Sequence, residues 1–498
     1  MRTLVALPIA LPLLAAALSI LVGRWRQAQR IIGVVTLAAV AVISAVLVVR
    51  VDADGVVAVQ AGGWPAPMGI SLVADRFATI MLALAALTLL VVLVYAIGQP
   101  GAEGTHVGFH PVYLVLASGV ASAFLTGDLF HLFVAFEVML TASYVLITLG
   151  GRADQVRTGM TYVVISLLAS TLFLIALAFV YSATGTVNMA DLSGALADVP
   201  SGVRSALAVL LLVVFGVKAA VFPLYFWLPD SYPTAPTPIT AVFAGLLTKV
   251  GVYAIIRSQT LLFPPGTFPA TLLLVVAGAT MVVGVLGAIA QDDVKRILSF
   301  HIVSQIGYMI MGLGLFTVAG LAGAILYVIH HIVVKTTLFL TAGLVELRAG
   351  SGRLARIGGL AHRSPLLGLL FLVPALSLAG LPPFSGFVAK LALVEAGLAA
   401  EQYVIVGVSL AVSLLTLFSM TKIWANAFWG EPSVEPSLSA AAAPPTGAGP
   451  RLMVGATVAL AVVSLAIAAA AAPLLRLSER AAVDLLDRSA YIEAVLGS

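Results

Sequence analysis

The chain has 498 residues, of which 61% are hydrophobic and 9% are charged, and its formal net charge is +4. Soluble domains carry about 25% charged residues, so this composition excludes a soluble globular protein and indicates an integral membrane protein. The absence of cysteine excludes disulfides, thiolate metal sites and iron–sulfur ligation by this chain. Basic residues form no concentrated block, so nucleic-acid binding is not indicated.

Hydrophobic runs of about 20 residues recur without the alternation typical of strands, which predicts transmembrane helices. The first run has more arginines after it than before it, the reverse of a cleaved signal peptide, and is predicted to be a retained helix. The predicted fold is an all-α integral membrane protein with 14 transmembrane helices, at residues 4–22, 31–49, 70–96, 111–126, 128–149, 159–183, 205–228, 238–257, 268–290, 297–316, 318–345, 365–398, 402–428 and 451–475.

The Lys and Arg residues between these runs indicate the orientation of the chain. If the N-terminus is outside, the cytoplasmic loops hold about twice as many Lys and Arg residues as the outer loops. Because cytoplasmic loops are enriched in basic residues, both termini are predicted to lie outside. After the last run, apolar residues are interspersed with charges, which predicts an amphipathic segment on the outer surface or against a partner.

Two of the runs are interrupted by proline. Pro223 and Pro229 break the run at 205–228, and Pro382 and Pro383 break the run at 365–398. Proline removes backbone donors, so carbonyl oxygens at these breaks must line a hydrated cavity or meet side chains. We therefore predict that the breaks lie beside a polar path rather than being static kinks.

The two broken runs also suggest an internal repeat. Lys218 precedes the first break and Lys390 follows the second, an order that fits inverted five-helix units formed by runs 4–8 and 9–13. The predicted organisation is N-terminal helices in 1–110, the first repeat in 111–257, the second in 268–428, and a loop, the last helix and an amphipathic tail in 429–498.

Ionisable side chains occur inside the predicted spans. A lysine at the centre of a transmembrane helix costs about 2.5–3.5 kcal/mol on insertion scales. One carboxylate cannot neutralise four ammonium groups, so some lysines must be uncharged, hydrated or paired with another subunit. This favours an ion path over ion pairs that only hold helices together. The residues are Glu137, Lys218, Lys249, Lys335 and Lys390.

Polar residues also recur at helical spacing and therefore share helix faces. His331 and Lys335 lie one turn apart, which favours a proton relay, whereas the adjacent His330 is expected to face elsewhere. For stripes of Ser, Thr and Tyr, hydrogen bonding between helices is the favoured interpretation. Candidates for a secondary polar path are Thr141, Tyr144, His301, Gln305, Tyr308 and Tyr327, and a further stripe consists of Tyr162, Ser166 and Ser170.

Motifs for nucleotide and metal chemistry are absent from the sequence. It contains no GxxxxGK[ST], no HExxH, no CxxC and no dinucleotide fingerprint. We therefore expect no cofactor, no metal and no catalytic chemistry of its own. Energy for transport must come from an ion gradient or a partner, and one charge crossing 100 mV is worth about 2.3 kcal/mol.

Four segments resemble the antiporter-like subunits shared by complex I and the Mrp-type cation/proton antiporters. They are VKAAVFPLYFWLPDSYPTAPTPITAVFAGLLTKVGVYAIIR, DVKRILSFHIVSQIGYMI, HHIVVKTTLFLTAG and AGLPPFSGFVAKLAL. The resemblance implies fourteen helices, the seventh and twelfth broken, and a proton path along a central polar axis. It also implies which residues carry protons: Glu137 in helix 5, Lys218 in helix 7, Lys249 in helix 8, His331 and Lys335 in helix 11, and Lys390 in helix 12.

Within that family, LPIALPLLAAALSIL and GGWPAPMGISLVADRFATI resemble the D-type subunits of Mrp antiporters. This implies a proton-translocating subunit of a multisubunit Na⁺/H⁺ antiporter in a bacterial plasma membrane, with other membrane subunits as partners. Lys390 disfavours the M-type subunit of complex I, where the family carries glutamate. The alternatives are a redox-driven pump subunit, in complex I or a membrane-bound hydrogenase, and a scaffold whose buried ions are structural.

Overall fold

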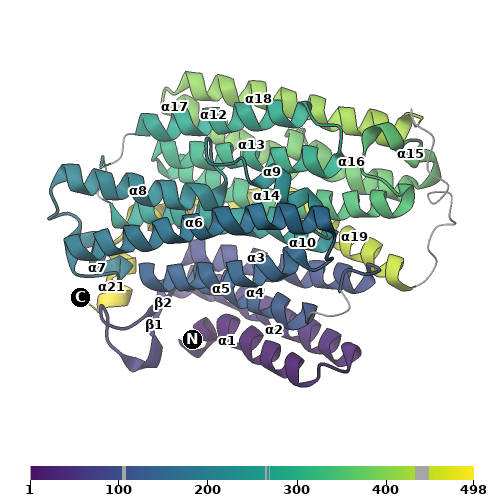
Figure 1. The fold of residues 1–498 in the computed structure, drawn as a ribbon. Helices are drawn as coiled ribbons and strands as arrows, with labels where there is room; N and C mark the ends of the chain where they lie inside the picture. The colour runs from purple at the N-terminus through teal and green to yellow at the C-terminus, as the bar shows by residue number, and fades with distance from the viewer. Residues whose placement is uncertain (1, 104–107, 264–265, 268–269, 432–447, 498) are drawn as a thin grey trace.

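The computed structural model describes residues 2–103, 108–263, 266–267, 270–431 and 448–497. Its helices run roughly side by side, and α1 begins at the same end of the bundle as α21 ends (Figure 1). The N-terminal part consists of the helices α1 Arg2–Leu21, α2 Arg26–Asp54 and α3 Arg76–Gly98, with the antiparallel strands β1 Val57–Gln60 and β2 Ser71–Ala74 between α2 and α3.

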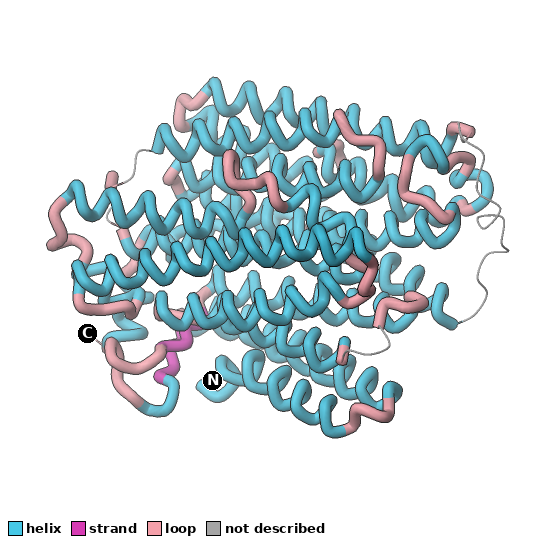
Figure 2. The backbone as a smooth tube through the Cα atoms, in the orientation of Figure 1, coloured by secondary structure: helices cyan, strands magenta, loops and turns pink. Residues whose placement is uncertain are grey.

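The hairpin corrects the predicted start of the third helix at residue 70. The side chain of Asp75 accepts a hydrogen bond from the backbone N–H of Ala78 and caps α3, so the helix begins after it. The apolar residues before Asp75 instead pair with β1, with Ala74 opposite Val57. The all-α prediction therefore missed one short sheet at the end of the bundle where the termini lie (Figure 2).

The middle of the chain forms the next group of helices. The break predicted after Lys218 lies between α8 and α9, in the middle of the bundle (Figure 2). The elements are α4 Phe109–Leu125, α5 Leu129–Thr148, α6 Ala153–Thr184, α7 Met189–Ala195, α8 Ser201–Ala219, α9 Leu228–Ser231, the 3₁₀ turn η2 Tyr232–Thr234, α10 Thr237–Val242, the π-helix η3 Phe243–Leu247, α11 Thr248–Arg257 and the π-helix η4 Ser258–Leu262.

The C-terminal half repeats the broken-helix pattern. α16 ends at Ala379 and α17 begins at Ser385, with Pro382 and Pro383 between them. The elements are α12 Ala270–Ile289, α13 Val294–Leu315, α14 Val318–Ala349, α15 Leu360–Arg363, α16 Pro365–Ala379, α17 Ser385–Ala399, α18 Tyr403–Ile423, the π-helix η6 Trp424–Trp429, α19 Ala448–Ala469, α20 Ala471–Leu486 and α21 Ser489–Leu496.

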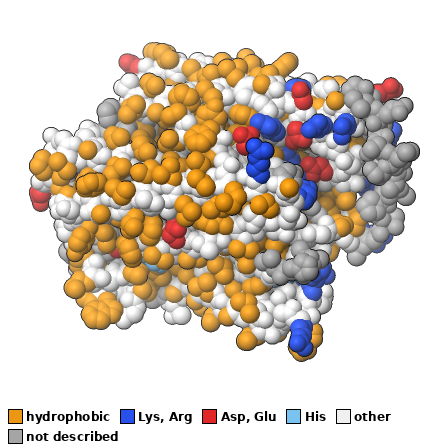
Figure 3. All heavy atoms as spheres, viewed as in Figure 1, with side chains coloured by type: hydrophobic (Ala, Val, Ile, Leu, Met, Phe, Trp, Pro, Cys, Tyr) orange, Lys and Arg blue, Asp and Glu red, His pale blue; other side chains and the backbone are white. Residues whose placement is uncertain are grey.

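The prediction of a multi-pass helical membrane protein is confirmed. Within the described residues, 12 helical segments are long and apolar enough to cross a membrane, and α4 and α16 are shorter apolar helices. Each predicted run overlaps one of these segments. Hydrophobic side chains cover most of the face seen in Figure 3, while Lys and Arg gather toward the end of the bundle away from the termini.

Three of the spans form the core of the bundle. The segment from α10 to η4, α13 and α14 are almost entirely buried, whereas only about a third of the residues of α1 and α2 are buried. The spans that carry Lys249, His331 and Lys335 are thus buried inside the bundle, as expected for ionisable groups when lipid is the solvent.

The amphipathic tail packs against its own chain. α20 lies against α3 and α14, and α21 lies against α7 and β1. Ala481, Ala482 and Leu485 of α20 are buried in these contacts. The predicted loop before α19 falls on residues 432–447, which lie outside the described part of the chain.

A buried group of polar contacts joins α2 to the connection between α3 and α4. Arg30 donates two hydrogen bonds to the carboxylate of Glu103, of 2.8 and 2.6 Å, and His110 Nε2 lies 2.9 Å from the same group. Burial alone would raise the pKa of Glu103, but the hydrogen bonds from Arg30 and His110 outweigh it and lower the pKa to about 2. Glu103 is therefore ionised, and its carboxylate joins α2 to α4.

Replacing Glu103 by glutamine should lower the free energy of unfolding by about 2–3 kcal/mol at pH 7, because the variant loses this stabilised charge. The folded pKa of Glu103 lies below its ordinary value of 4.5, so the contribution is complete above that pH and is lost as the pH falls toward 2. Thermal unfolding of the purified protein at several pH values measures this. A melting-temperature difference from wild type that does not shrink below pH 4.5 would contradict it.

Candidate functional site

Two of the predicted proton-carrying residues, Glu137 and Lys218, are joined through a serine hydroxyl. Ser170 of α6 donates a hydrogen bond to Glu137 Oε1 on α5. The ammonium of Lys218, in the last turn of α8, lies 3.3 Å from Ser170 Oγ and 3.2 Å from the carbonyl oxygen of Ser166. Glu137 is half-buried, whereas Lys218 is 7% exposed. Ser170 therefore couples the carboxylate to the ammonium across three helices.

A small cavity adjoins Lys218. Its volume is 20 Å³, enough for one water molecule, and Lys218, Ser166 and Tyr232 contribute to its lining. The hydroxyl of Tyr232 is fully buried and has no hydrogen-bond partner among the described residues. A water in this cavity would satisfy that hydroxyl and extend the polar contacts of Lys218 toward the chain break.

Lys249 lies at the centre of the buried span that runs from α10 to η4. Its ammonium is fully buried and donates to the carbonyl oxygen of Ala244, at 2.5 Å, and to Thr248 Oγ1, at 3.1 Å. The π-helix η3 directly precedes Thr248. Single π-helical turns are frequent at functional sites. Within the described residues no carboxylate forms an ion pair with Lys249.

The predicted cluster of α13 and α14 is fully buried and incompletely bonded. The Tyr327 hydroxyl donates to Gln305 Oε1, and the rings of Tyr308 and Tyr327 stack at 5.1 Å. Among the described residues, both ring nitrogens of His331 and the ammonium of Lys335 have no hydrogen-bond partner. Each such buried group costs about 1–3 kcal/mol unless it is satisfied. Internal water would satisfy these groups, and bound water can carry protons between titratable groups.

The second break holds Lys390. Its ammonium donates to the carbonyl oxygens of Leu378 and Ala379, both at 3.1 Å, and to Ser413 Oγ at 2.7 Å. It also lies 4.9 Å from the ring centroid of Tyr308. The carbonyls left free where α16 ends are thus met by a lysine, as predicted for the breaks.

Comparison with known proteins places these residues in a family. Residues 126–416 match the transmembrane family described as NADH:quinone oxidoreductase/Mrp antiporter. The chain belongs to this family. It is 47% identical to the D-type Na⁺/H⁺ antiporter subunit of Alkalihalophilus pseudofirmus over 100% of both chains. It is 42% identical to that of Bacillus subtilis, over 88% of this chain and 89% of the relative.

A solved structure agrees with the match to the antiporter family. A chain in the structure of the Mrp complex from Dietzia sp. has a TM-score of 0.92 and 37% sequence identity to this chain, and the match covers 100% of both. The family fold therefore extends over the whole chain, including the helices outside residues 126–416.

In this antiporter-family chain, not every residue of the predicted secondary polar path lies in the buried cluster of α13 and α14. Thr141 is exposed on the surface of α5, because the turn that carries Glu137 and Thr141 faces outward. The ring of Tyr144 packs against Tyr162, and its hydroxyl has no partner among the described residues. His301 Nε2 lies 2.9 Å from Ser419 Oγ, which links α13 to α18.

The four prolines have different positions at the breaks. Pro223 follows α8, and Pro382 and Pro383 lie between α16 and α17. Pro229 instead lies in the first turn of the short helix α9, where a missing N–H costs nothing. Pro229 therefore starts a helix after the first break and does not itself interrupt one.

The sequence interpretation missed His330. Its ring is fully buried, and Nδ1 lies 2.9 Å from Ser385 Oγ, at the second break. Ser385 in turn lies 3.0 Å from Ser377. His330 was expected only to face elsewhere than His331, and the structure places its ring against the broken helix. The adjacent pair of histidines in the sequence could have indicated this contact, because neighbouring residues on a helix point toward different neighbouring helices.

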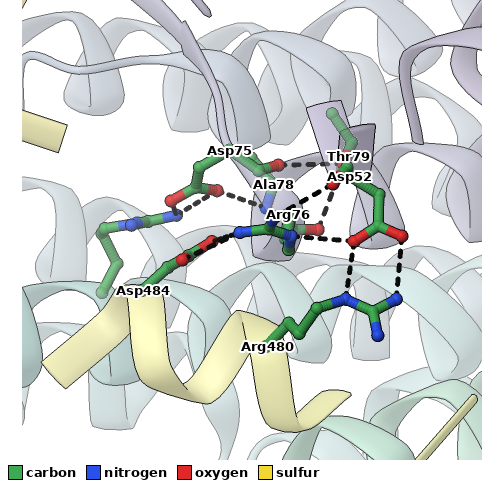
Figure 4. A network of polar contacts seen from close by, with 8 residues as sticks. Asp52, Asp75, Arg76, Ala78, Thr79, Arg480 and Asp484 are labelled. Carbon is green, nitrogen blue, oxygen red and sulfur yellow. Dashed lines mark hydrogen bonds and ion pairs between the residues drawn. The ribbon is translucent and has the colours of Figure 1, made fainter. Parts of the chain in front are cut away.

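The sequence interpretation also missed an ion network at the end of the bundle where the termini lie. Arg257, at the end of α11, is buried and lies 2.6 Å from Asp75. Arg76 joins Asp52 of α2, at 2.9 Å, to Asp484 of α20, at 2.7 Å, as Figure 4 shows. Arg257 is the last residue of the predicted run 238–257, so the sequence alone did not indicate that it is buried. The network joins α2, α3, α11 and α20 with paired charges, which indicates a structural role.

Proposed function

We propose that this chain is the D-type, proton-translocating subunit of a multisubunit Na⁺/H⁺ antiporter. The observation that carries the proposal is the row of buried titratable groups without matching charges at the core of the bundle. Lys249 and Lys335 are fully buried, and no carboxylate among the described residues pairs with either. The D-type antiporter relatives provide the family context for this row.

The proposed path follows the polar contacts across the bundle. A proton passes from Glu137 through Ser170 to Lys218, and then to Lys249 at the centre. From there it passes through His331 and Lys335 and the polar side chains of α13 to Lys390. Internal water bridges the steps that the side chains do not span. Proton movement along this path drives Na⁺ outward through the complex.

The scaffold alternative conflicts with the energetics of these residues. Ion pairs that hold helices together need partners, as Arg257 and Asp75 have. A lysine without a partner destabilises the fold, so its presence is explained by transport. The redox-driven alternative differs in its partners: co-purification with an iron–sulfur or quinone-reducing arm would support it.

We also propose the orientation and repeat organisation of the chain. Lys and Arg gather at the end of the bundle away from the termini, which supports a cytoplasmic position for that end and an outer position for both termini (Figure 3). Two helices broken beside a lysine, α8 with Lys218 and α17 with Lys390, support inverted repeats at 111–257 and 268–428. The apolar periphery is available to lipid and to other membrane subunits.

Exchange assays on the whole complex in everted bacterial membrane vesicles test the proposed function. Replacing Glu137 or Lys218 by alanine should reduce Na⁺-driven proton movement by at least about 100-fold, because each variant removes a group that holds the transferred proton. The matched control is Glu479→Ala, which removes an exposed carboxylate on α20. Full exchange by both Glu137→Ala and Lys218→Ala would refute the proposal.

A further inference from the structure

A polar pocket opens at the end of the bundle opposite the tail. α3 begins beside α20 and ends at this pocket. The pocket has a volume of 440 Å³ and is formed by the end of α3, the turn between α5 and α6, the segment before α10, the start of α13 and the end of α14. Its polar lining includes Gln99, Arg152, Gln155, Thr237, Lys295 and Glu346.

An ion pair lies in this pocket. Lys295 Nζ lies 2.6 Å from Glu346 Oε2, and the side chains are 7% and 32% exposed, so the carboxylate is the partner that water reaches. Gly352 provides the space: a Cβ there would lie 3.1 Å from Glu346 Oε1 and 3.0 Å from Asp293 Oδ2. Because Gly352 has no side chain, the carboxylates of Glu346 and Asp293 can both lie close to its backbone.

Hydroxyl groups lie directly inside Glu346. A Cβ at Gly343 of α14 would lie 2.5 Å from the Tyr95 hydroxyl and 2.9 Å from Thr237 Oγ1. Because position 343 has no side chain, these two hydroxyls lie against α14 about one turn inward from Glu346. The Tyr95 hydroxyl donates to the carbonyl oxygen of Leu340 at 3.0 Å, and Thr237 contributes to the pocket lining.

The helices that frame the pocket carry the two central lysines. Lys335 and Glu346 are about three turns apart on α14 and therefore lie on the same face. The ammonium of Lys249 donates back along its helix to the carbonyl oxygen of Ala244. Ala244 follows Thr237 in the same helical segment and lies about 10 Å further into the bundle, at a rise of 1.5 Å per residue. Both lysines are thus aligned with the inner end of the pocket.

We propose that this pocket is the port through which protons from the adjacent aqueous phase reach Lys249 and Lys335, with Glu346 as the group that collects them. Glu346 leaves Lys295, takes a proton from hydronium and passes it inward through the hydroxyls of Thr237 and Tyr95 and intervening water to a neutral lysine amine. The carboxylate then returns to Lys295. This inference rests on the proposed function, and it connects the proposed proton path to the adjacent aqueous phase.

The first test measures access to the pocket. The chain has no cysteine, so Thr237→Cys introduces a unique thiol. In everted vesicles carrying the whole complex, a membrane-impermeant thiol reagent should label this chain, detected by its mass, and should slow exchange. In right-side-out vesicles the same reagent should leave it unlabelled. Absence of labelling in everted vesicles would overturn the proposal that water reaches Thr237.

The second test measures the pH profile of exchange. The groups around Glu346 are Lys295 of α13, Asp293 at the N-cap of α13, Arg152 of the turn between α5 and α6, and Tyr95 of α3. Glu346→Gln should lower exchange about tenfold or more at alkaline pH, where protons are scarce, and Glu346→Asp should restore part of it. Lys295→Met should also change the rate of exchange per complex, because it removes the ion pair that holds the Glu346 carboxylate in place.

A purely structural ion pair would behave differently. Glu346→Gln and Lys295→Met would then both reduce the amount of assembled complex, with the exchange per complex and its pH profile unchanged, and the port would be refuted. The control is Glu479→Gln, an exposed carboxylate on α20. Normal exchange by Glu346→Gln alongside inactive Lys218→Ala refutes only the port, whereas normal exchange by both refutes the proposed function as well.

Discussion

Replacing Lys335 by methionine should abolish cation/proton exchange while leaving the complex at least as stable as wild type. The ammonium of Lys335 is fully buried, and among the described residues it has no hydrogen-bond or ion-pair partner. The centroid of the Phe339 ring lies 5.9 Å from it. Methionine has a similar length and needs no polar partner, so the variant removes an unsatisfied group without leaving a cavity.

The measurement compares melting temperature with exchange at equal amounts of assembled complex. We expect no decrease in melting temperature, and exchange reduced by about 100-fold or more. The matched control is Lys422→Met, which removes a lysine that donates to Ile289 O, Gln291 O and Asp292 outside the core and should lose stability instead. A Lys335→Met complex that is both active and destabilised would show that Lys335 is structural.

Replacing Arg257 by methionine should have the opposite effect. Its loss leaves the buried carboxylate of Asp75 unpaired, which costs about 3–5 kcal/mol. The guanidinium also packs over the rings of Phe77, Tyr253 and Tyr491, so the C-terminal helix α21 would lose a contact too. We therefore expect little assembled complex, but nearly normal exchange per complex for the fraction that assembles.

Protein yield after mild detergent extraction, melting temperature and exchange per complex measure this together. Arg480→Met is the control, because Arg480 is 46% exposed and its pair with Asp52 should contribute less than about 1 kcal/mol. Normal stability with lost exchange in Arg257→Met would place Arg257 in the proton path and would refute its structural role.

The sequence was sufficient for the features that depend on one chain segment. Lys218, Lys249, Lys335 and Lys390 stand out because they interrupt apolar runs, and the structure buries all four. The broken helices followed from proline positions, since proline cannot continue a backbone hydrogen-bond ladder. The helical type of the spans followed from the length of the apolar runs, and within the described residues 12 helices are long and apolar enough to cross a membrane.

Features that depend on contacts between segments could not be predicted. Asp75 and Arg257 lie far apart in the sequence, and only the packing of α3 against α11 brings them together. The second strand of the hairpin, β2, was absorbed into an apolar run, because three of its four residues are apolar and resemble the start of a helix. Helical periodicity placed Thr141 beside Glu137 but could not tell that this face is exposed.

Proton flux through purified complexes in liposomes tests the central claim most directly. Wild-type and Lys218→Ala complexes are reconstituted in equal amounts, and the initial rate of proton movement is measured after an imposed Na⁺ gradient. If buried lysines carry the protons, the Lys218→Ala complex should assemble normally and show almost no Na⁺-driven proton movement. A rate equal to wild type would contradict the claim.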